Sequence, residues 1–422
     1  MRPGDLTRDD LLALDVHDPL AEFRGGFEAP PPGRIFMDAN SLGPMPREAP
    51  ARILHAMQKE WSAQRRHAWH VADWLDSPQR IGAAYAPLLG ARPEDVIATD
   101  NTTLNLTKLL AYGLALAKQD EAGGVARNTI IHEREGFPTD SHVVQGVVHH
   151  GDGRWQARAI DGPADLDAAL GPDVVMLVLA HADYRSSRRW NMAQVNALAH
   201  RCGAKVLWDL SHTAGVVPVE LDASRADFAV ACGYKYLCAG PGAPALAWIR
   251  ADLQDRVWPA FPGWLGHAER LDFRIDYRPA GGMLSLVGGT MPVLQDVVME
   301  CAARLWATVA PSAIYARHQS LSTTFCRLML ERCAPFGVEL ASPADYDQRG
   351  GHLAFRCPGG GATCEALLDA GVTTSFRQPD VIRFGLSPAA LVHADLWEAV
   401  ERLRGILASE RWRLPQFQAV SI

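Results

Sequence analysis

The feature that most constrains the fold of this chain is a continuous apolar run over residues 174–180, which read Val-Val-Met-Leu-Val-Leu-Ala. Such a run lacks the alternation of a half-exposed strand and is typical of a central parallel strand that is covered on both faces. The residues that follow predict a helix over 192–201, a stop near Gly203 and a strand over 205–208. This strand–helix–strand unit favours a parallel α/β sheet.

Three further apolar segments, residues 96–99, 129–132 and 227–232, read as strands of the same sheet. Residues 149–153, which read His-His-Gly-Asp-Gly, are expected to form a surface turn between short polar strands. In parallel sheets, ligands bind beyond the carboxyl ends of the strands. Residues of suitable chemistry follow the predicted strands: Asp100, Phe137, Ser186, Asp209 and Lys235. We therefore expect one shared site at this edge of the sheet.

Lys235 follows a buried strand and stands between Tyr234 and Tyr236. An amine in this position needs a partner or a covalent fate, and a Schiff base to an aldehyde cofactor fits. Asp209 can hold a protonated pyridine nitrogen, while His212 can reach a phosphate or the ring. A lysine that buries only its aliphatic stem is the alternative, which Asp209 and His212 disfavour.

Two segments around these residues resemble the most specific signatures of a known family. They are residues 209–215, Asp-Leu-Ser-His-Thr-Ala-Gly, and residues 234–237, Tyr-Lys-Tyr-Leu, with the Gly-Pro-Gly-Ala-Pro tail at 240–244. The family is that of the kynureninases, hydrolases of the class-V aminotransferase superfamily that use pyridoxal 5'-phosphate (PLP). The resemblance extends from about Met37 to the C-terminal helix, which is nearly the whole chain.

The resemblance implies the PLP-dependent transferase fold of type I, an α/β fold in which a large domain with a mainly parallel seven-stranded sheet carries a small C-terminal α/β domain. We predict an N-terminal arm over residues 1–34, a large PLP-binding domain over 35–310 and a small domain over 311–422. Pro311 marks the last boundary, because it lies between two predicted helices. The polar arm is expected to lie over the surface near the small domain.

Thr102 and Thr103 lie where a strand turns into a helix that runs towards Ala117. Hydroxyl groups and free backbone amides at the N-terminus of a helix form a phosphate site. Capping of the helix by Asn101 or Thr102 is an alternative, and both roles are compatible. The resemblance favours phosphate binding by Thr102 and Thr103.

The resemblance also assigns roles that the residues alone leave open. Phe137 would stack on the pyridine ring and Asp140 would support the site, although a phenylalanine in this position is more often part of a core. Residues matching Trp264 and Thr290 come from the neighbouring subunit in the family, so a homodimer with shared active sites is implied. The implied cofactor-binding set is Thr102, Thr103, Phe137, Asp140, Ser186, Asp209, His212, Tyr234, Lys235, Trp264 and Thr290.

Arg383 lies in the otherwise apolar strand predicted over residues 381–386. A buried arginine needs an anion, which an internal salt bridge or the α-carboxylate of an amino acid can supply, and the resemblance favours the carboxylate. The resemblance also places Trp69 against the aryl ring of the substrate. Asn40 and Ser41 either line the site or belong to a plain strand-to-turn segment.

These assignments imply a hydrolase that cleaves the Cβ–Cγ bond of kynurenine or a substituted kynurenine to an anthranilate and L-alanine. Lys235 would carry the cofactor and take the α-proton, Asp209 would keep the ring protonated, and Tyr234 would relay a proton. A related PLP lyase for β-elimination or desulfuration, and a non-catalytic relative that keeps the fold, are the alternative hypotheses. No cysteine lies on an obvious Gly/Ser-rich loop, which argues against a desulfurase.

The chain departs from the family pattern at several clustered positions. Residues 187–192 read Ser-Arg-Arg-Trp-Asn-Met where glycine and a later Asp-Met are usual. Cys238-Ala239 replaces Asn-Gly, and Ser285 and Ser375 stand where arginine and aspartate are expected. The cofactor residues are kept while the loops around the substrate differ. This pattern favours a modified kynurenine or another γ-keto amino acid as the substrate.

Composition excludes several other classes of function. The net charge of −7 gives no basic surface for nucleic acid. The 8 cysteines form no Cys-x-x-Cys pair, and His67 and His70 lack the carboxylate or cysteine that would complete a metal site. The N-terminus lacks an apolar signal-peptide core, and no stretch reaches the length of a membrane span. We therefore expect a cytoplasmic enzyme with a small amino-acid substrate and no metal, nucleic-acid or membrane partner.

Overall fold

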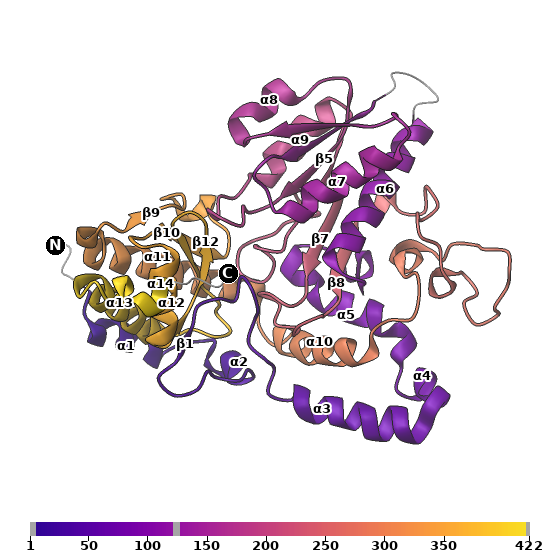
Figure 1. Ribbon diagram of the computed structural model, residues 1–422. Coiled ribbons are helices and arrows are strands. Elements are labelled where there is room, and N and C mark those ends of the chain that lie inside the picture. Colours follow the sequence, from indigo (N-terminus) through magenta and orange to yellow (C-terminus); the bar gives the residue numbers. More distant parts are fainter. Residues whose placement is uncertain (1–5, 121–126, 419–422) are drawn as a thin grey trace.

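The computed structural model describes residues 6–120 and 127–418, and a seven-stranded sheet forms its centre (Figure 1). Residues 1–5 of the predicted arm and 419–422 of the predicted small domain lie outside the described ranges. The strands of the sheet are β2 (Val96–Thr99), β3 (Thr129–Glu133), β4 (Gln156–Ile160), β5 (Val174–Ala180), β6 (Lys205–Asp209), β7 (Phe228–Cys232) and β8 (Ala245–Ile249). Their order is β2-β8-β7-β6-β5-β3-β4, and the sheet is mainly parallel, since β8 alone runs antiparallel to its neighbours in this described sheet.

Helices cover both faces of this sheet, which explains why its central strands β5 and β7 are apolar throughout. The helices of this part are α3 (Ala49–His55), α4 (Ala68–Val71), α5 (Ser77–Tyr85), α6 (Thr102–Asp120), α7 (Pro138–His150), α8 (Leu166–Ala169), α9 (Met192–Arg201) and α10 (Val293–Trp306). On one face, α6 and α7 pack against Val230 and Ile249. On the other face, α5, α9 and α10 pack against Trp208 and Trp248, both fully buried. Successive residues of β7 and β8 thus alternate between two cores.

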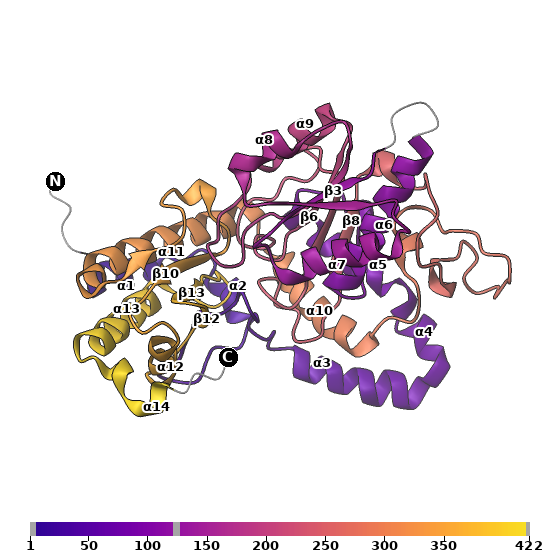
Figure 2. The ribbon, with the colours of Figure 1, turned by 45° about the horizontal axis from the view of Figure 1, so that its top comes forward.

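A second, smaller sheet lies beside the first part (Figure 1, orange and yellow; Figure 2). The elements of this C-terminal part are α11 (Pro311–Arg332), β9 (Glu339–Leu340), β10 (His352–Arg356), α12 (Gly361–Asp369), β11 (Val372–Thr373), β12 (Ser375–Arg377), β13 (Val381–Gly385), α13 (His393–Ala408) and α14 (Pro415–Gln418). The sheet is antiparallel in the order β12-β13-β10-β9, and it has its own core around Phe325, Phe355 and Phe384. The chain start joins this part, because β1 (Ile35–Phe36) pairs in parallel with β11.

Most of the predicted elements are confirmed, and two predictions were wrong. The strands over 96–99 and 174–180 and the helix over 192–201 match the structure to the residue. The turn at 149–153 was expected between two short strands, but a helix precedes it, because His149 and His150 are the last residues of α7 (Pro138–His150). The N-terminal segment is not polar throughout, because α1 (Arg8–Val16) and α2 (Ala21–Gly25) bury apolar side chains such as Leu11 and Phe23.

Within residues 6–120 and 127–418, no single helix is long and apolar enough to cross a membrane. The pair α10 and α11 has the length and composition for it, but the two helices are bent by 87° relative to each other. No group of three or more His, Cys, Asp or Glu side chains in those ranges forms a metal-ion cluster.

One carboxylate anchors α1 to the C-terminal part. Asp15 accepts hydrogen bonds from the amides of His393 and Ala394, each at 2.9 Å, at the start of α13. It also pairs at 3.0 Å with Arg317 of α11, whose side chain is only 5% exposed. Burial opposes ionisation, but the two amides and Arg317 outweigh it and lower the pKa of Asp15 below its usual range. The anchor therefore combines a helix cap with a buried ion pair.

We expect Asp15→Ala to lower the free energy of unfolding by about 3 kcal/mol, because α13 loses its cap and Arg317 loses one of its carboxylates. Urea denaturation at neutral pH measures this loss. The exposed Asp9 in the same helix is the control, and Asp9→Ala should change stability by less than about 0.5 kcal/mol. Because folding lowers the pKa of Asp15, its contribution is lost as the pH falls through that lowered value. Equal losses in the two variants would contradict the anchor.

Candidate active site

Lys235 lies beyond the carboxyl end of β7, in a turn that leaves only 9% of it exposed. Its Nζ atom is 3.1 Å from Nε2 of His212, which follows β6. The ring centroid of Phe137, just before α7, lies 5.6 Å from the same nitrogen, and that of Tyr234 lies 6.0 Å away. The structure thus brings residues from three predicted strand ends together around one amine.

Two buried carboxylates, Asp209 and Asp140, belong to the same site. Asp209 ends β6 and accepts a hydrogen bond from the amide of Ser211 at 2.8 Å. Asp140 lies in the first turn of α7, and neither of its oxygens has a hydrogen-bond partner among the described residues. Burial, and then the charge of Asp209, raises the pKa of Asp140 well above its usual range. Asp140 therefore keeps its proton to a higher pH than an exposed aspartate.

The other groups beside the amine are uncharged at neutral pH. Burial, and then the charge of Lys235, lowers the pKa of His212 well below its usual range, so its imidazole is neutral. Burial raises the pKa of Tyr234 to about 12, so its phenol keeps its proton. Nδ1 of His212 has no hydrogen-bond partner in the described part of the chain. Both carboxylate oxygens of Asp140 and Nδ1 of His212 thus have no hydrogen-bond partner among the described residues.

The segment that follows β1 holds the lysine turn in place. The amide of Gly43 donates to the carbonyl of Tyr234 at 2.9 Å, and a Cβ at residue 43 would lie 2.2 Å from the carbonyl oxygen of Lys235. Only glycine permits this approach. Cys238 closes the turn with a φ of 61°, in the left-handed region that glycine and asparagine tolerate best. The cysteine is therefore strained at a position where the resembled family carries asparagine.

Arg383, in β13, is 1% exposed and forms no ion pair with a described carboxylate. Its guanidinium donates to the carbonyl of Tyr184 at 2.7 Å, and to the hydroxyl of Ser375 through Nε (3.1 Å) and Nη2 (2.9 Å). Burial, and then the neighbouring Arg377, lowers the pKa of Arg383 to about 10. A buried cation that only neutral acceptors hold is well suited to receive a carboxylate.

Asn40 and Ser41 adjoin this arginine. Asn40 is 1% exposed and donates through Nδ2 to the hydroxyl of Ser375 at 3.3 Å, while its Oδ1 has no partner among the described residues. The hydroxyl of Ser41 lies 3.5 Å from Nη2 of Arg383, at the limit of a hydrogen bond. Both residues therefore border the arginine rather than the lysine.

The remaining predicted residues have no hydrogen bond, ion pair or ring contact with Lys235 in the described chain. They are Thr102, Thr103, Ser186, Trp69, Trp264 and Thr290. Thr102 and Thr103 begin α6, and Ser186 donates its hydroxyl to Asp183 at 2.6 Å. Trp69 packs edge-on against Trp74 with ring centroids 5.4 Å apart. The described contacts therefore do not place these six residues against the amine.

Trp264 and Thr290 lie in the loop-rich segment between β8 and α10, which extends away from the large sheet at the right of Figure 1. Trp264 is 37% exposed and stacks on Phe273 with centroids 6.1 Å apart, and Thr290 is exposed. In the described chain, neither residue forms a hydrogen bond or a ring contact with Lys235. Within the described chain, these two residues therefore do not complete the site around their own Lys235.

The sequence prediction missed His352, the first residue of β10. His352 is 1% exposed, and its ring centroid lies 5.5 Å from that of His212. A histidine that opens an otherwise apolar strand is the same kind of signal that identified Arg383. Its place beside His212 depends on the packing of the two sheets, which the sequence does not display.

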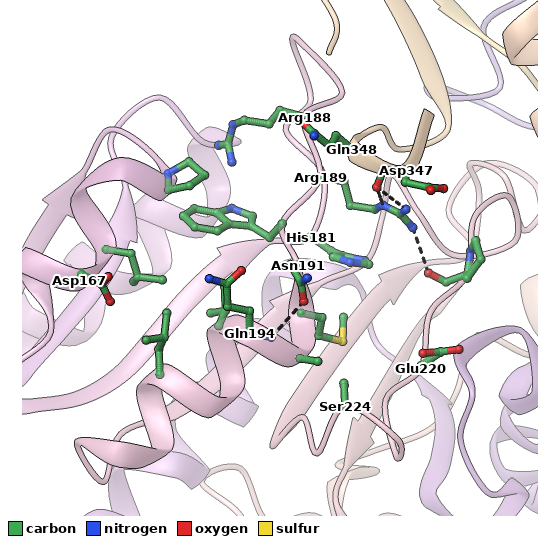
Figure 3. Close-up of a pocket in the computed structure, with 18 residues that line it drawn as sticks. Asp167, His181, Arg188, Arg189, Asn191, Gln194, Glu220, Ser224, Asp347 and Gln348 are labelled. Atoms are coloured by element: carbon green, nitrogen blue, oxygen red, sulfur yellow. Dashed lines mark hydrogen bonds between the residues drawn. The ribbon is translucent and has the colours of Figure 1, made fainter. Parts of the chain in front are cut away.

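The divergent residues 188–192 wall a cavity of about 670 Å³ that includes neither Lys235 nor any residue predicted to bind cofactor or substrate (Figure 3). Arg189 crosses its edge and donates to the carbonyls of Asp347 at 2.6 Å and Pro218 at 3.4 Å. Among the divergent positions, it is Ser375 and Cys238 that adjoin the predicted site. Divergence at 188–192 thus shapes a separate cavity.

Comparisons with known proteins place this geometry in a family. A family model described as "Kynureninase C-terminal domain" matches residues 314–403. A kynureninase of Burkholderia mallei (strain SAVP1) is 38% identical over 411 residues, covering 97% of this chain and 98% of that protein. A kynureninase of Pseudomonas fluorescens is 35% identical over 412 residues, covering 98% of each.

Solved structures share the fold at low sequence identity. The cysteine desulfurase CsdA from Escherichia coli superposes with a TM-score of 0.75 at 16% identity, covering 92% of this chain and 98% of that one. A C-DES variant with glycine covalently linked to its PLP cofactor gives a TM-score of 0.73 at 17% identity, covering 88% and 96%. These likenesses confirm the predicted fold of type I.

The proton on Asp140 predicts how stability of the cofactor-free protein depends on pH. Because folding raises the pKa of Asp140, the free energy of unfolding falls as the pH rises from the usual value of 3.8 towards the folded value. Asp140→Asn removes this titration and keeps the shape, so the variant should gain stability relative to the wild type between about pH 5 and about pH 8. Urea denaturation across that range measures the gain, with the exposed Asp152→Asn as control. A difference that is constant with pH would contradict the assignment.

Proposed function

This chain belongs to the kynureninase family, and from that membership we propose that it hydrolyses the Cβ–Cγ bond of kynurenine or a substituted kynurenine. The products are an anthranilate and L-alanine. The observation that carries the proposal is the buried amine of Lys235, which lies 3.1 Å from a neutral imidazole in a site with two buried carboxylates. An amine held in this way is available for covalent attachment to an aldehyde.

The residues present fit PLP as the cofactor. Both oxygens of Asp140 and Nδ1 of His212 are buried without partners among the described residues, so they are free to contact a polar ligand. We propose that Lys235 holds the cofactor covalently, with Asp209, His212 and Phe137 around its ring. The wider set consists of Thr102, Thr103, Ser186 and Tyr234 from this chain, and of Trp264 and Thr290 from a second copy. When bound, PLP supplies an electron sink for the α-carbon of an attached amino acid.

Lys235, Asp209 and Tyr234 would each have a separate role in proton transfer. The amine of Lys235, released when the substrate's amine takes its place, would take the α-proton, and the neutral His212 at 3.1 Å leaves it free to do so. Asp209 would hold the pyridine nitrogen in its protonated form. Water adds to the γ-carbonyl carbon, the Cβ–Cγ bond breaks, and the aryl-bearing fragment leaves as the anthranilate. Tyr234, which keeps its phenolic proton, is placed to return a proton to the three-carbon fragment that leaves as alanine.

Substrate binding rests on Arg383 and its neighbours. Arg383 is a buried guanidinium without a carboxylate partner, so we assign to it the α-carboxylate of the substrate. Asn40 and Ser41 border that position, and Trp69 is assigned to the aryl ring. The half-buried Trp69 packs on Trp74, whose indole nitrogen donates to Glu60 at 3.0 Å. This support fixes the orientation of the proposed aryl wall.

The chemistry of the cysteines disfavours desulfuration. A desulfurase needs a reactive thiolate that can reach the substrate. Six of the eight cysteines are buried, and Cys202 and Cys364 are only partly exposed. Cys232 and Cys238 each lie three residues from Lys235 in the sequence, and burial raises the pKa of both thiols. No cysteine of the described chain is exposed as persulfide chemistry requires.

We also propose the finer points of the biological setting. The reaction belongs to the catabolism of tryptophan-derived amino acids, in the cytoplasm. The division into an arm over 1–34, a large domain over 35–310 and a small domain over 311–422 stays a prediction. It is supported by the separate cores of the two sheets and by the pairing of β1 with β11.

We propose a homodimer in which each copy completes the other's site. Large apolar side chains are uncovered in two regions, the helix that continues α3 and the segment that contains Trp264. Trp61 is 56% exposed in the first region, and Ile275 is 99% exposed in the second. Exposed apolar groups of this size mark a surface that another chain covers. A second copy would cover them and bring Trp264 and Thr290 to the neighbouring cofactor.

Activity tests the proposal directly. The purified protein, loaded with PLP, should release an anthranilate and alanine in equal amounts from kynurenine or 3-hydroxykynurenine. Lys235→Ala should lower kcat by about 10³-fold, because the amine is lost both as attachment point and as base. The exposed Lys118→Ala should leave kcat unchanged. Pyruvate and ammonia in place of alanine would overturn hydrolysis in favour of elimination.

The dimer is tested by its mass in solution. Sedimentation of the wild type should give two chains, and the double variant Trp61→Glu with Ile275→Asp should give one chain with weaker PLP binding. Val16, which is 73% exposed on α1, supplies the matched apolar control. Val16→Glu should leave the dimer intact. A wild-type protein that sediments as a single chain and binds PLP fully would refute the shared site.

A further inference from the structure

His352 is a buried imidazole beside the lysine site for which the proposed chemistry has no role. It belongs to the C-terminal part, is 1% exposed, and its ring lies 5.5 Å from that of His212 at an angle of 64°. His212 in turn lies 3.1 Å from Nζ of Lys235. His352 is therefore in contact with the group that contacts the amine.

The backbone around His352 is docked on the same two loops. The amide of Gly351 donates to the carbonyl of His212 at 2.9 Å. A Cβ at residue 350 would lie 3.0 Å from that carbonyl, and a Cβ at residue 351 would lie 2.6 Å from the ring of Tyr236, which follows the lysine. The pair Gly350-Gly351 thus permits an approach that side chains would block. This approach fixes the position of the His352 ring relative to His212.

A hydrogen bond from the His352 ring orients it as well. Nε2 lies 3.4 Å from the carbonyl of Arg185 and donates to it, which leaves Nδ1 with a lone pair and no partner among the described residues. Arg185 belongs to the segment after β5, so His352 spans from the C-terminal part to the large sheet. An imidazole held on one nitrogen and packed on His212 has a defined ring plane.

His352 provides this support without adding charge. The groups that face it are His212, Arg383 of β13, Lys235 and Arg377 of β12. Burial, and then the charge of Arg383, lowers the pKa of His352 well below its usual range, with smaller effects from Lys235 and Arg377. The ring is therefore neutral at neutral pH. A protonated imidazole in its place would be repelled by the three cations around it.

We propose that His352 is a positioning residue of the lysine site: it holds the ring of His212 so that Nε2 faces the amine of Lys235. The inference rests on the proposed function, since the amine acts there in binding PLP and in proton transfer. Support for the amine then comes from the C-terminal part of the chain, and it exists only while residues 350–352 are docked on His212.

The test compares His352→Leu and His352→Gln in the dimeric holoenzyme. For His352→Leu we expect kcat to fall about tenfold, as for other groups that orient a directly acting imidazole, with KM changed less than about twofold. The pH at which the absorbance of bound PLP changes should shift by about one unit, because His212 no longer faces the amine. His352→Gln should recover most of both, since its amide can donate to the carbonyl of Arg185.

His318→Gln is the matched control. His318 is another buried imidazole of the C-terminal part, and it contacts the carbonyl of Gly351 at 3.3 Å and the hydroxyl of Tyr346 at 3.0 Å. Its substitution disturbs the same backbone without facing His212, so the pH profile and the absorbance should match the wild type. Equal shifts in His318→Gln and His352→Leu would overturn the proposal, as would a wild-type profile in His352→Leu.

A double variant separates positioning from general stability. His212→Gln should shift the absorbance profile as His352→Leu does, and combining the two should add little, because both act at one amine. Full additivity would refute the inference. If His352→Leu does not fold, the smaller His352→Ala carries the same expectation. A protein that binds PLP without cleaving kynurenine or a substituted kynurenine would refute the proposed function and leave the absorbance test of His352 valid.

Discussion

The burial of the Lys235 amine is the constraint on which the rest of the site depends. An ammonium group that leaves water needs compensation, and a site that crowds further charges around it becomes costly. Here burial itself limits the charge. The pKa of Asp140 is raised and the pKa values of His212 and His352 are lowered, in each case first by desolvation. The amine is thus surrounded largely by neutral polar groups, which leaves room for the charges of an incoming ligand.

The sheet explains how these groups meet. The lysine turn connects β7 to the antiparallel β8, so the end of one strand and the start of the next lie at the same edge. The parallel strands β3 and β6 deliver Phe137 and Asp209 to that edge from far apart in the chain. The close contact of Gly43 with the Lys235 carbonyl then pins the turn from the N-terminal side. Each contribution comes from local structure that the sheet brings into register.

Features that depend on local sequence were predicted, whereas features that depend on the packing of distant segments were not. The strand over 174–180 was predicted to the residue, because a strand buried on both faces is written as an unbroken apolar run. Helix α7 was not predicted, because residues 149–153 indicated a turn between strands, although Pro138 at the first helical position favours a helix start. His352 was missed because its contact with His212 depends on how the two sheets pack against each other. The 56% exposure of Trp61 could not be foreseen either, since the sequence does not show which large apolar side chains remain uncovered in a single chain.

The antiparallel ladder of β10 and β13 connects Arg383, which is proposed to bind the substrate carboxylate, with His352, which lies beside His212 of the lysine site. Ala354 pairs with Arg383 and His352 pairs with Gly385, so Arg383 and His352 lie on one face two residues apart along the ladder. Gly385 has no side chain, and Asn40 occupies the space that a Cβ there would need. The ladder therefore fixes Arg383 and His352 relative to each other. The guanidinium proposed to bind the substrate carboxylate and the imidazole that faces His212 thus belong to one paired unit of the C-terminal part.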